Sequence, residues 1–186
     1  MHIESEIKSW GPAESQFGAR IRDAILPELE NVLLRAYRSV GQNFDKVPKD
    51  MYDREERKFR RISTGDFTPE YFAEQRIIAR DIAALVNYPT YLLGYAVYGG
   101  GLMCALFDAV RWQGKDARHK QTLSLMRSIF SDVAVAMSHF YDVEEQKRAE
   151  ERAKLHQAQV EDAKQLEAAM TALATGLRKL ASGDLA

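Results

Sequence analysis

The chain has 186 residues, of which 46% are hydrophobic and 28% are charged, and its formal net charge is -1. This composition is sufficient for a buried core, and the balanced charge gives no electrostatic reason to expect nucleic acid as a partner. The single cysteine, Cys104, excludes an intrachain disulfide and suits a reducing cytoplasm. The first ten residues are polar and mixed in charge, so we expect no secretory signal and a cytoplasmic location.

The chain is predicted to be almost entirely helical, because it contains only five prolines and no run that alternates with a period of two. From residue 28 to 40, hydrophobic side chains recur at three- and four-residue steps, which predicts an amphipathic helix. A loop over 41–50 follows, and then a short basic helix over 52–62. Its basic residues alternate with Glu55 and Glu56, so a solvated helix face is favoured over an anion site. The basic residues of this run are Arg54, Arg57, Lys58, Arg60 and Arg61.

The turn Thr64–Asp66 ends the basic helix, because its central glycine readily adopts the left-handed conformation of a C-terminal cap. Thr68 and Pro69 then open the next helix as its N-cap and first residue. This helix is predicted to run to about Val86, where Asn87–Pro89 breaks it.

An apolar segment follows this break. Residues 90–107 carry no charged side chain, and a segment of this length could span a bilayer. The segment also contains four glycines and three tyrosines and lies between ordinary amphipathic segments. We therefore predict a buried helix over about 90–112 and no membrane span. A polar loop over 113–118 separates this helix from the last one.

The last helix is predicted to start near His119 and to continue for a long way, because no proline or glycine occurs between residues 115 and 175. After Tyr141 the composition changes to Glu, Lys, Arg, Gln and Ala. Hydrophobic residues then follow a heptad pattern that predicts a dimeric coiled coil. The pattern consists of Leu166, Met170, Leu173, Leu177 and Leu180. These features divide the chain into a compact domain, 1–142, and a coiled-coil stalk, 143–186.

The first part of the stalk has a weaker pattern. Projected backwards, the heptad seam meets poor core residues over 152–159, including His156 and Gln159. Either the coil is loose there, or its register shifts onto Leu155 and Val160. Two competing registers in this segment are a plausible signalling device.

Two stretches resemble the sensor domains of globin-coupled sensors, namely FRRISTGDFTPEY at 59–71 and NYPTYLLGY at 87–95. The resemblance covers roughly 21–141. The tail at 177–185 is similar to the entry into a HAMP-like signalling segment of methyl-accepting chemotaxis proteins. The resemblance implies an all-α, globin-like sensor domain followed by a long coiled-coil signalling helix. It also implies that the chain is the sensory end of a longer transducer, which acts on downstream chemotaxis signalling proteins.

The resemblance also identifies the position of the missing iron ligand. Without a gap, the family pattern puts Ile82 where the proximal haem histidine is expected, and Tyr37 where a distal tyrosine faces the ligand. An isoleucine has no lone pair for a metal, so we expect no cofactor. Haem held by unusual ligation is the alternative. Of the four histidines, His139 alone lies in a core-bearing helix, and a slip of one or two residues would bring Asp81 or Arg80 to the ligand position.

Without haem, the pocket is either filled by side chains or holds another ligand. The candidates for filling it are Ile77, Ile78, Ile82, Leu85 and Val86. A small polar or anionic ligand would use arginine, which pairs with carboxylates, and tyrosine hydroxyls on apolar walls. The candidate pocket residues are Tyr37, Arg80, Ile82, Tyr88, Tyr91, Tyr95 and Tyr98, with Arg76 beside them.

The family resemblance further implies a homodimer in which the last two globin helices form a four-helix bundle with those of a second subunit. Glycine inside a helix is unfavourable by up to about 1 kcal/mol relative to alanine, so the glycines of the apolar helix suggest a close approach by a partner helix or a ligand. The dimer and signalling candidates are Gly94, Gly99, Gly100, Gly101, His139 and His156.

Three functions follow as hypotheses. The first is a haem-free sensory input domain of a bacterial chemoreceptor that responds to a small ligand. The second is a haem-based oxygen or redox sensor with unusual ligation. The third is a structural dimerisation module that binds nothing. We expect no enzyme, because the chain has no phosphate-binding glycine loop, no metal-spaced His/Cys set and no nucleophile–base pattern.

Overall fold

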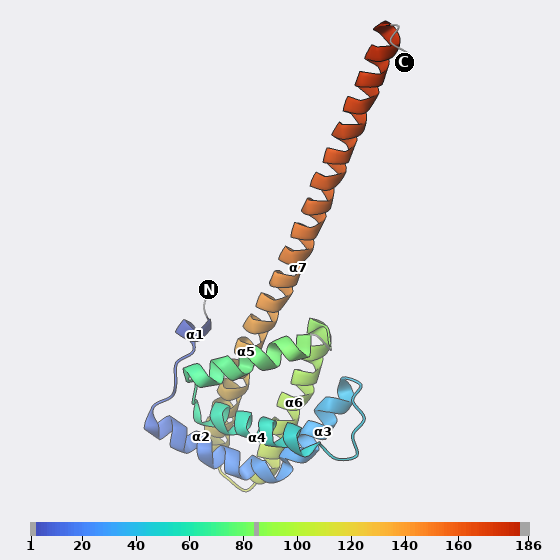
Figure 1. The fold of residues 1–186 in the computed structure, drawn as a ribbon. Helices are drawn as coiled ribbons and strands as arrows, with labels where there is room; N and C mark the ends of the chain where they lie inside the picture. The colour runs from blue at the N-terminus through green and yellow to red at the C-terminus, as the bar shows by residue number, and fades with distance from the viewer. Residues whose placement is uncertain (1–2, 84–85, 183–186) are drawn as a thin grey trace. The chain divides into compact units, whose positions relative to one another are not determined.

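The computed structural model describes residues 3–83 and 86–182, and in these residues the fold is all-α, as predicted, with no strand. The chain divides into two units, Met1–Val143 and Glu144–Ala186. The last helix runs through both units (Figure 1). The helices are α1 (Ile3–Glu6), α2 (Pro12–Ile25), α3 (Leu29–Ser39), α4 (Lys49–Thr64), α5 (Pro69–Ala83), α6 (Tyr88–Ala109) and α7 (Lys115–Ser182), with a short 3-10 turn, η1 (Leu26–Glu28), between α2 and α3.

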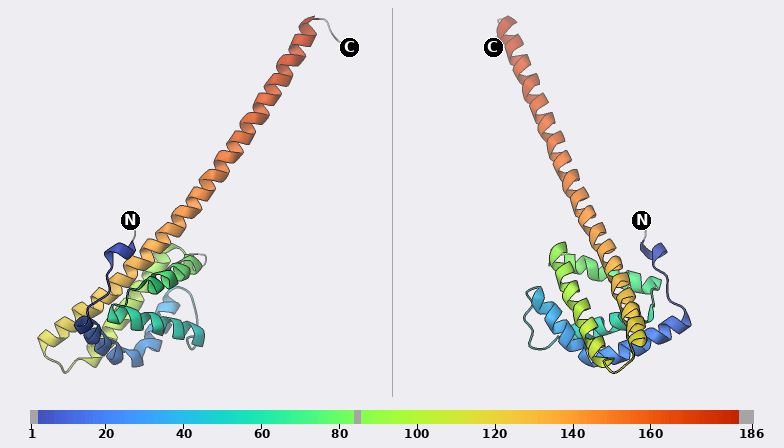
Figure 2. Two further views of the ribbon diagram at one scale, coloured as in Figure 1. Left: turned by 60° about the vertical axis from the view of Figure 1, so that its left-hand side comes forward. Right: turned by 180° about the vertical axis from the view of Figure 1, so that it is seen from behind.

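Helix α2 was not expected from the sequence. Pro12 occupies its first position, and the Gly11 N–H donates to the Glu14 carboxylate at 3.2 Å, as in a capping box. α2 packs against both α4 and α6 (Figure 2). Gly18 allows the crossing with α4, since a Cβ atom there would lie 1.8 Å from the carbonyl oxygen of Ser63. Glycine is unfavourable inside a helix, so Gly18 makes this helix difficult to predict from residue propensities. The packing against α4 nevertheless requires a glycine at this position.

The predicted ends of α4 and α6 have clear local causes. Gly65 caps α4 with a φ of +64°, which confirms the predicted glycine turn. The predicted break at Asn87–Pro89 is an N-cap, because the Asn87 side chain accepts a hydrogen bond from the Thr90 N–H at 3.0 Å. The last helix begins at Lys115 rather than near His119, with Asp116 favourably placed in its first turn.

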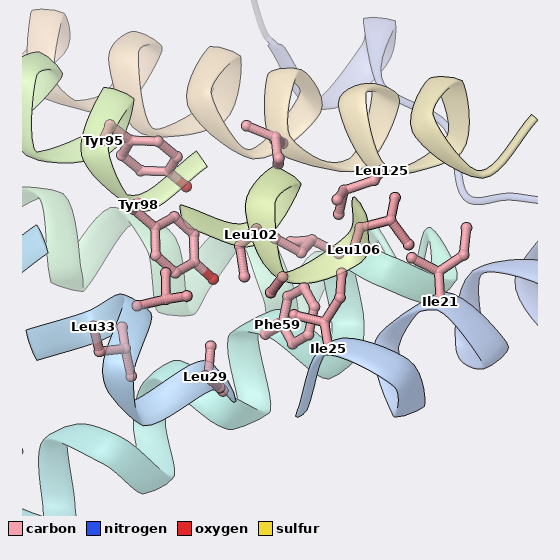
Figure 3. Packing of buried hydrophobic residues seen from close by; sticks show 14 of the residues in the cluster. Ile21, Ile25, Leu29, Leu33, Phe59, Tyr95, Tyr98, Leu102, Leu106 and Leu125 are labelled. Carbon is pink, nitrogen blue, oxygen red and sulfur yellow. The ribbon is translucent and has the colours of Figure 1, made fainter. Parts of the chain in front are cut away.

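The core of the first unit forms where α3 and α6 pack together and α4 closes over them. Figure 3 shows Tyr95, Tyr98, Leu102 and Leu106 following one another along α6 toward Phe59 of α4. Helix α6 is apolar and long enough to cross a bilayer by composition alone, as many core helices are. In the structure its buried face belongs to this core.

Three of the four α6 glycines are explained by packing inside one chain. Added Cβ atoms on Gly94 and Gly101 would lie 2.7 Å and 2.8 Å from Val40 and Val32, and one on Gly99 would lie 3.3 Å from a side-chain carbon of α7. The close neighbours that the sequence suggested are therefore helices α3 and α7 of the same chain. Gly100 differs from them, because it is exposed and faces open space.

In the second unit, helix α7 carries the predicted heptad residues on its surface. Leu166, Met170, Leu173 and Leu177 are all exposed in the single chain. His156 is exposed on the same helix. The side chain of Leu180 and the tail residues 183–185 lie outside the part of the chain that the structure describes.

Candidate ligand pocket

A pocket of about 360 Å³ lies in the first unit, and its walls come from α3, the following loop, α4, α5 and α6. Its lining is mostly apolar or aromatic, with one polar stretch on α4. The lining residues are Leu33, Ala36, Tyr37, Val40, Gln42, Phe44, Met51, Arg54, Glu55, Lys58, Ile78, Ile82, Val86, Tyr91, Gly94, Tyr95 and Tyr98. The pocket thus contains both Tyr37 and Ile82, two of the residues that were predicted to line it.

Helix α4 supplies the charged side chains of the pocket. Its residues Met51, Arg54, Glu55 and Lys58 follow the three- and four-residue spacing of one helix face. The prediction that this basic helix presents a solvated face is wrong for two of its residues, because the side chains of Lys58 and Glu55 are only 10% and 11% exposed. The alternation of charges along the sequence concealed that these two lie on the buried face.

Lys58 is at the centre of a buried charge cluster. Its Nζ lies 2.8 Å from Oε2 of Glu55 and 3.7 Å from Oδ2 of Asp132, a residue of α7 that is completely buried. Burial alone would lower the pKa of Lys58, but the two carboxylates outweigh this effect and hold the pKa well above its usual value. Lys58 is therefore an ammonium that connects the pocket to α7.

Asp132 is held from a second side. The Tyr71 hydroxyl of α5 donates a hydrogen bond to its Oδ1, whereas Oδ2 has no hydrogen-bond partner among the described residues. Burial raises the pKa of Asp132, although Lys58 and Tyr71 act against that rise. Burial and the neighbouring carboxylate raise the pKa of Tyr71, which keeps this phenol protonated and donating.

Two tyrosine rings of α6 cover the lysine. The Nζ of Lys58 lies 5.4 Å from the ring centroid of Tyr95 and 5.3 Å from that of Tyr98, within the range of cation–π contacts. Burial raises the pKa of Tyr98. Within the described residues both hydroxyls are buried without a hydrogen-bond partner.

Tyr37, on α3, lies near Glu55 and Arg54 of α4. Its hydroxyl is 3.4 Å from Oε1 of Glu55, and burial followed by the charge of Glu55 raises the pKa of Tyr37 to about 12. The phenol is thus neutral at physiological pH. Tyr91 also lines the pocket, and burial raises its pKa as well.

The remaining predicted residues lie elsewhere. Arg80 is 70% exposed beside Asp81 and does not line the pocket. Ile78 and Ile82 are four residues apart and face the pocket together. Arg80 lies midway between them in sequence, so it is on the opposite face of the helix and points away from the pocket. Tyr88 contacts the ring of Phe140, with centroids 5.5 Å apart, rather than the pocket.

The other sequence candidates are also outside the pocket. Arg76 pairs with Glu4 on the surface, and Ile77 is exposed. His139 is buried on α7, and burial followed by the charge of Arg76 lowers its pKa. Leu85 lies outside the described residues.

Asp132 is a site residue that was not expected from the sequence. A signal was present, because Asp132 is a single carboxylate within the hydrophobic stretch from Ile129 to Val135 on the last helix. Aspartate is almost never fully buried unless it is paired. That rule predicts a cationic partner, although it does not identify which lysine or arginine supplies it.

The donors that line the pocket do not fit a histidine-ligated haem. Ile82 has no lone pair, and none of the described residues that line the pocket is a histidine. Lys58 is protonated between two carboxylates, and Tyr37 stays a neutral phenol. The thioether of Met51 is the remaining soft donor, and methionine serves haem as a partner of histidine.

Comparison of the chain with protein-family profiles, with curated proteins and with solved structures finds no match. The likeness to globin-coupled sensors thus rests on the motifs at 59–71 and 87–95. The geometry of the pocket is independent of that likeness.

Proposed function

We propose that the chain is a haem-free sensory input domain of a bacterial chemoreceptor, of the globin-coupled sensor type, and that it binds a small ligand in the pocket beside Lys58. The sensor-globin motifs support the family, and the occurrence of Tyr37 and Ile82 in one pocket agrees with the family pattern. The proposal gives the chain a role in binding and signalling, with no catalytic step.

The observation that carries the proposal is the link from the pocket to α7. Lys58 lines the pocket and is also paired with Asp132, a buried residue of the helix that continues into the stalk. A ligand that moves Lys58 would change the balance between its two carboxylates. Because Asp132 has no other cation within ion-pair distance among the described residues, α7 would respond by a small shift or rotation.

The proposed sensor acts as a homodimer, since both α6 and α7 carry an apolar stripe without a partner. On α6 the exposed stripe follows four- and three-residue steps, and on α7 its residues are seven and eleven apart, so each set lies on one helix face. The α6 stripe consists of Leu93, Val97, Gly100, Cys104 and Phe107, and the α7 stripe of Leu123, Phe130 and Tyr141. The open space at Gly100 suits the close approach of a second copy.

The second unit would carry the signal onward. Its exposed heptad residues suit a parallel coiled coil with the partner's stalk. The weak seam over 152–159, which contains His156, is the segment where two registers could compete. The proposed recipients are chemotaxis signalling proteins that bind to the output part of the transducer.

A haem-based sensor is the second candidate, and a haemin titration separates it from the first. Purified protein incubated with haemin and then desalted should give a visible spectrum without a Soret band, because no histidine is among the described lining residues. A sharp Soret band that survives desalting, and that disappears in His139→Ala, would support the haem-based alternative.

A further inference from the structure

The pocket contains two cations that differ in their surroundings. Lys58 is balanced by two carboxylates, whereas Arg54, one turn earlier on the same face of α4, makes no ion pair among the described residues. Arg54 is partly buried, and its Nε is buried without a hydrogen-bond acceptor. The charge of Arg54 and a side-chain hydrogen bond from it both lower the pKa of the Tyr37 phenol, against the larger effects of burial and Glu55, so it is Nε that lacks an acceptor.

A buried guanidinium donor without an acceptor is unfavourable, so such groups are normally paired. The natural complement is a carboxylate, which can accept from Nε and a terminal nitrogen of arginine in a bidentate pair. Glu55 does not supply this complement, because its carboxylate is engaged by Lys58 at 2.8 Å. The pocket thus has one unfilled position for a single negative charge.

The rest of the lining defines the body of the ligand. Much of the remaining lining is apolar and includes Leu33 and Val40 from α3 and the residue after it, and Ile78, Ile82 and Val86 from α5 and the segment after it. Such walls exclude a sugar or a polyanion, whose polar groups would lose water without gaining partners. A cationic ligand is disfavoured, because it would lie beside the positive charges of Arg54 and Lys58, and Lys58 already lies over the rings of Tyr95 and Tyr98.

We propose that the pocket binds an apolar monocarboxylate, with its carboxylate on Arg54 and its hydrocarbon or aromatic body against the isoleucine and valine side chains. This inference rests on the proposed function only in taking the pocket to be a binding site. The inference names the class of ligand. The selectivity of the pocket comes from one charge pair and from the mostly apolar lining of a volume of about 360 Å³.

Isothermal titration calorimetry of the full chain at pH 7 tests the class of ligand. The probes are octanoate and 3-phenylpropionate as carboxylates, octanamide as the neutral isostere and octylamine as the cation. We expect at least one carboxylate to bind at least tenfold more tightly than octanamide, and octylamine not to bind. Equal affinity for octanoate and octanamide, or binding of no carboxylate, would overturn the inference.

Two arginine variants test whether Arg54 is the residue that pairs with the ligand carboxylate. Arg54→Met should weaken carboxylate binding at least tenfold and leave octanamide binding unchanged, since methionine keeps an apolar side chain in the pocket wall. Arg57→Met is the matched control, because Arg57 is exposed on the same helix and does not line the pocket. Unchanged carboxylate affinity in Arg54→Met would contradict the proposed pair.

Failure of the ligand class and failure of the sensory function give different results. If octanamide binds as well as octanoate and binding alters α7, the sensory role stands and the class is wrong. If octanoate binds through Arg54 but hydrogen exchange in α7 does not change, the class stands and the sensory role is contradicted.

Discussion

Replacement of Lys58 by methionine is expected to lower the free energy of unfolding by about 3–5 kcal/mol. The substitution removes the only cation that pairs with Glu55 and Asp132 among the described residues, and it leaves two carboxylates in a nearly dry site. Methionine is close to lysine in length, so loss of packing contributes little. For a unit of this size the melting temperature should fall by roughly 10 °C.

Chemical denaturation monitored by circular dichroism measures this effect, with Arg57→Met as the exposed control on the same helix. The triple variant Lys58→Met/Glu55→Gln/Asp132→Asn should recover most of the lost stability, because it removes all three charges together. A Lys58→Met protein within about 1 kcal/mol of the wild type would show that the cluster is solvated rather than buried.

The same cluster gives an alkaline pH dependence. The pKa of Lys58 in the folded chain is raised above its unfolded value of about 10.4. Its contribution to stability is therefore complete below that value and is lost as the pH rises through the folded pKa. The stability difference between wild type and Lys58→Met should accordingly be constant through neutral pH and shrink only above about pH 10.4.

The second large effect concerns the dimer. Val97→Glu together with Phe130→Glu should convert a dimer into a monomer, because each substitution places a carboxylate in the centre of an apolar stripe. Burying an unpaired charge costs several kcal/mol, so the dimer should weaken by at least about 100-fold, equivalent to about 2.7 kcal/mol. Light scattering after size-exclusion chromatography measures the change in mass.

Two controls separate dimer loss from unfolding. Ala73→Glu, at an exposed position of α5 outside both stripes, should remain a dimer. The double variant should keep its helical circular dichroism, since Val97 and Phe130 are exposed in the single chain. Cys104, the one cysteine, lies in the α6 stripe and allows crosslinking of the wild-type dimer by a short bismaleimide. A wild-type chain that is monomeric at micromolar concentration would contradict the proposed dimer.

The sequence predicts the local parts of this molecule well, because their causes are local. Gly65 and Asn87 mark helix ends through backbone conformation and capping, which depend on a few neighbouring residues. The spacing of Ile78 and Ile82 places both on one face of α5, and the motif alignment assigned Tyr37 to the same pocket.

The charge cluster could not be predicted, because it depends on contacts between residues far apart in the chain. Lys58 and Asp132 meet only when α4 and α7 pack together, and nothing in the sequence near either residue identifies its partner. Arg80 was proposed because it is near the pocket residues in sequence, yet its position on α5 turns it toward solvent. The arginine that does line the pocket, Arg54, lies in a run of alternating charges typical of a solvated helix.

The most direct test of the account is amide hydrogen exchange of the full chain with and without bound octanoate, or octanamide if that binds equally well. We expect slower exchange in α3 and α4 and a ligand-dependent change in α7 around residues 128–143. In Asp132→Asn the change in α3 and α4 should remain and the change in α7 should be lost. Protection of the pocket helices without any change in wild-type α7 would contradict a sensory link through Lys58.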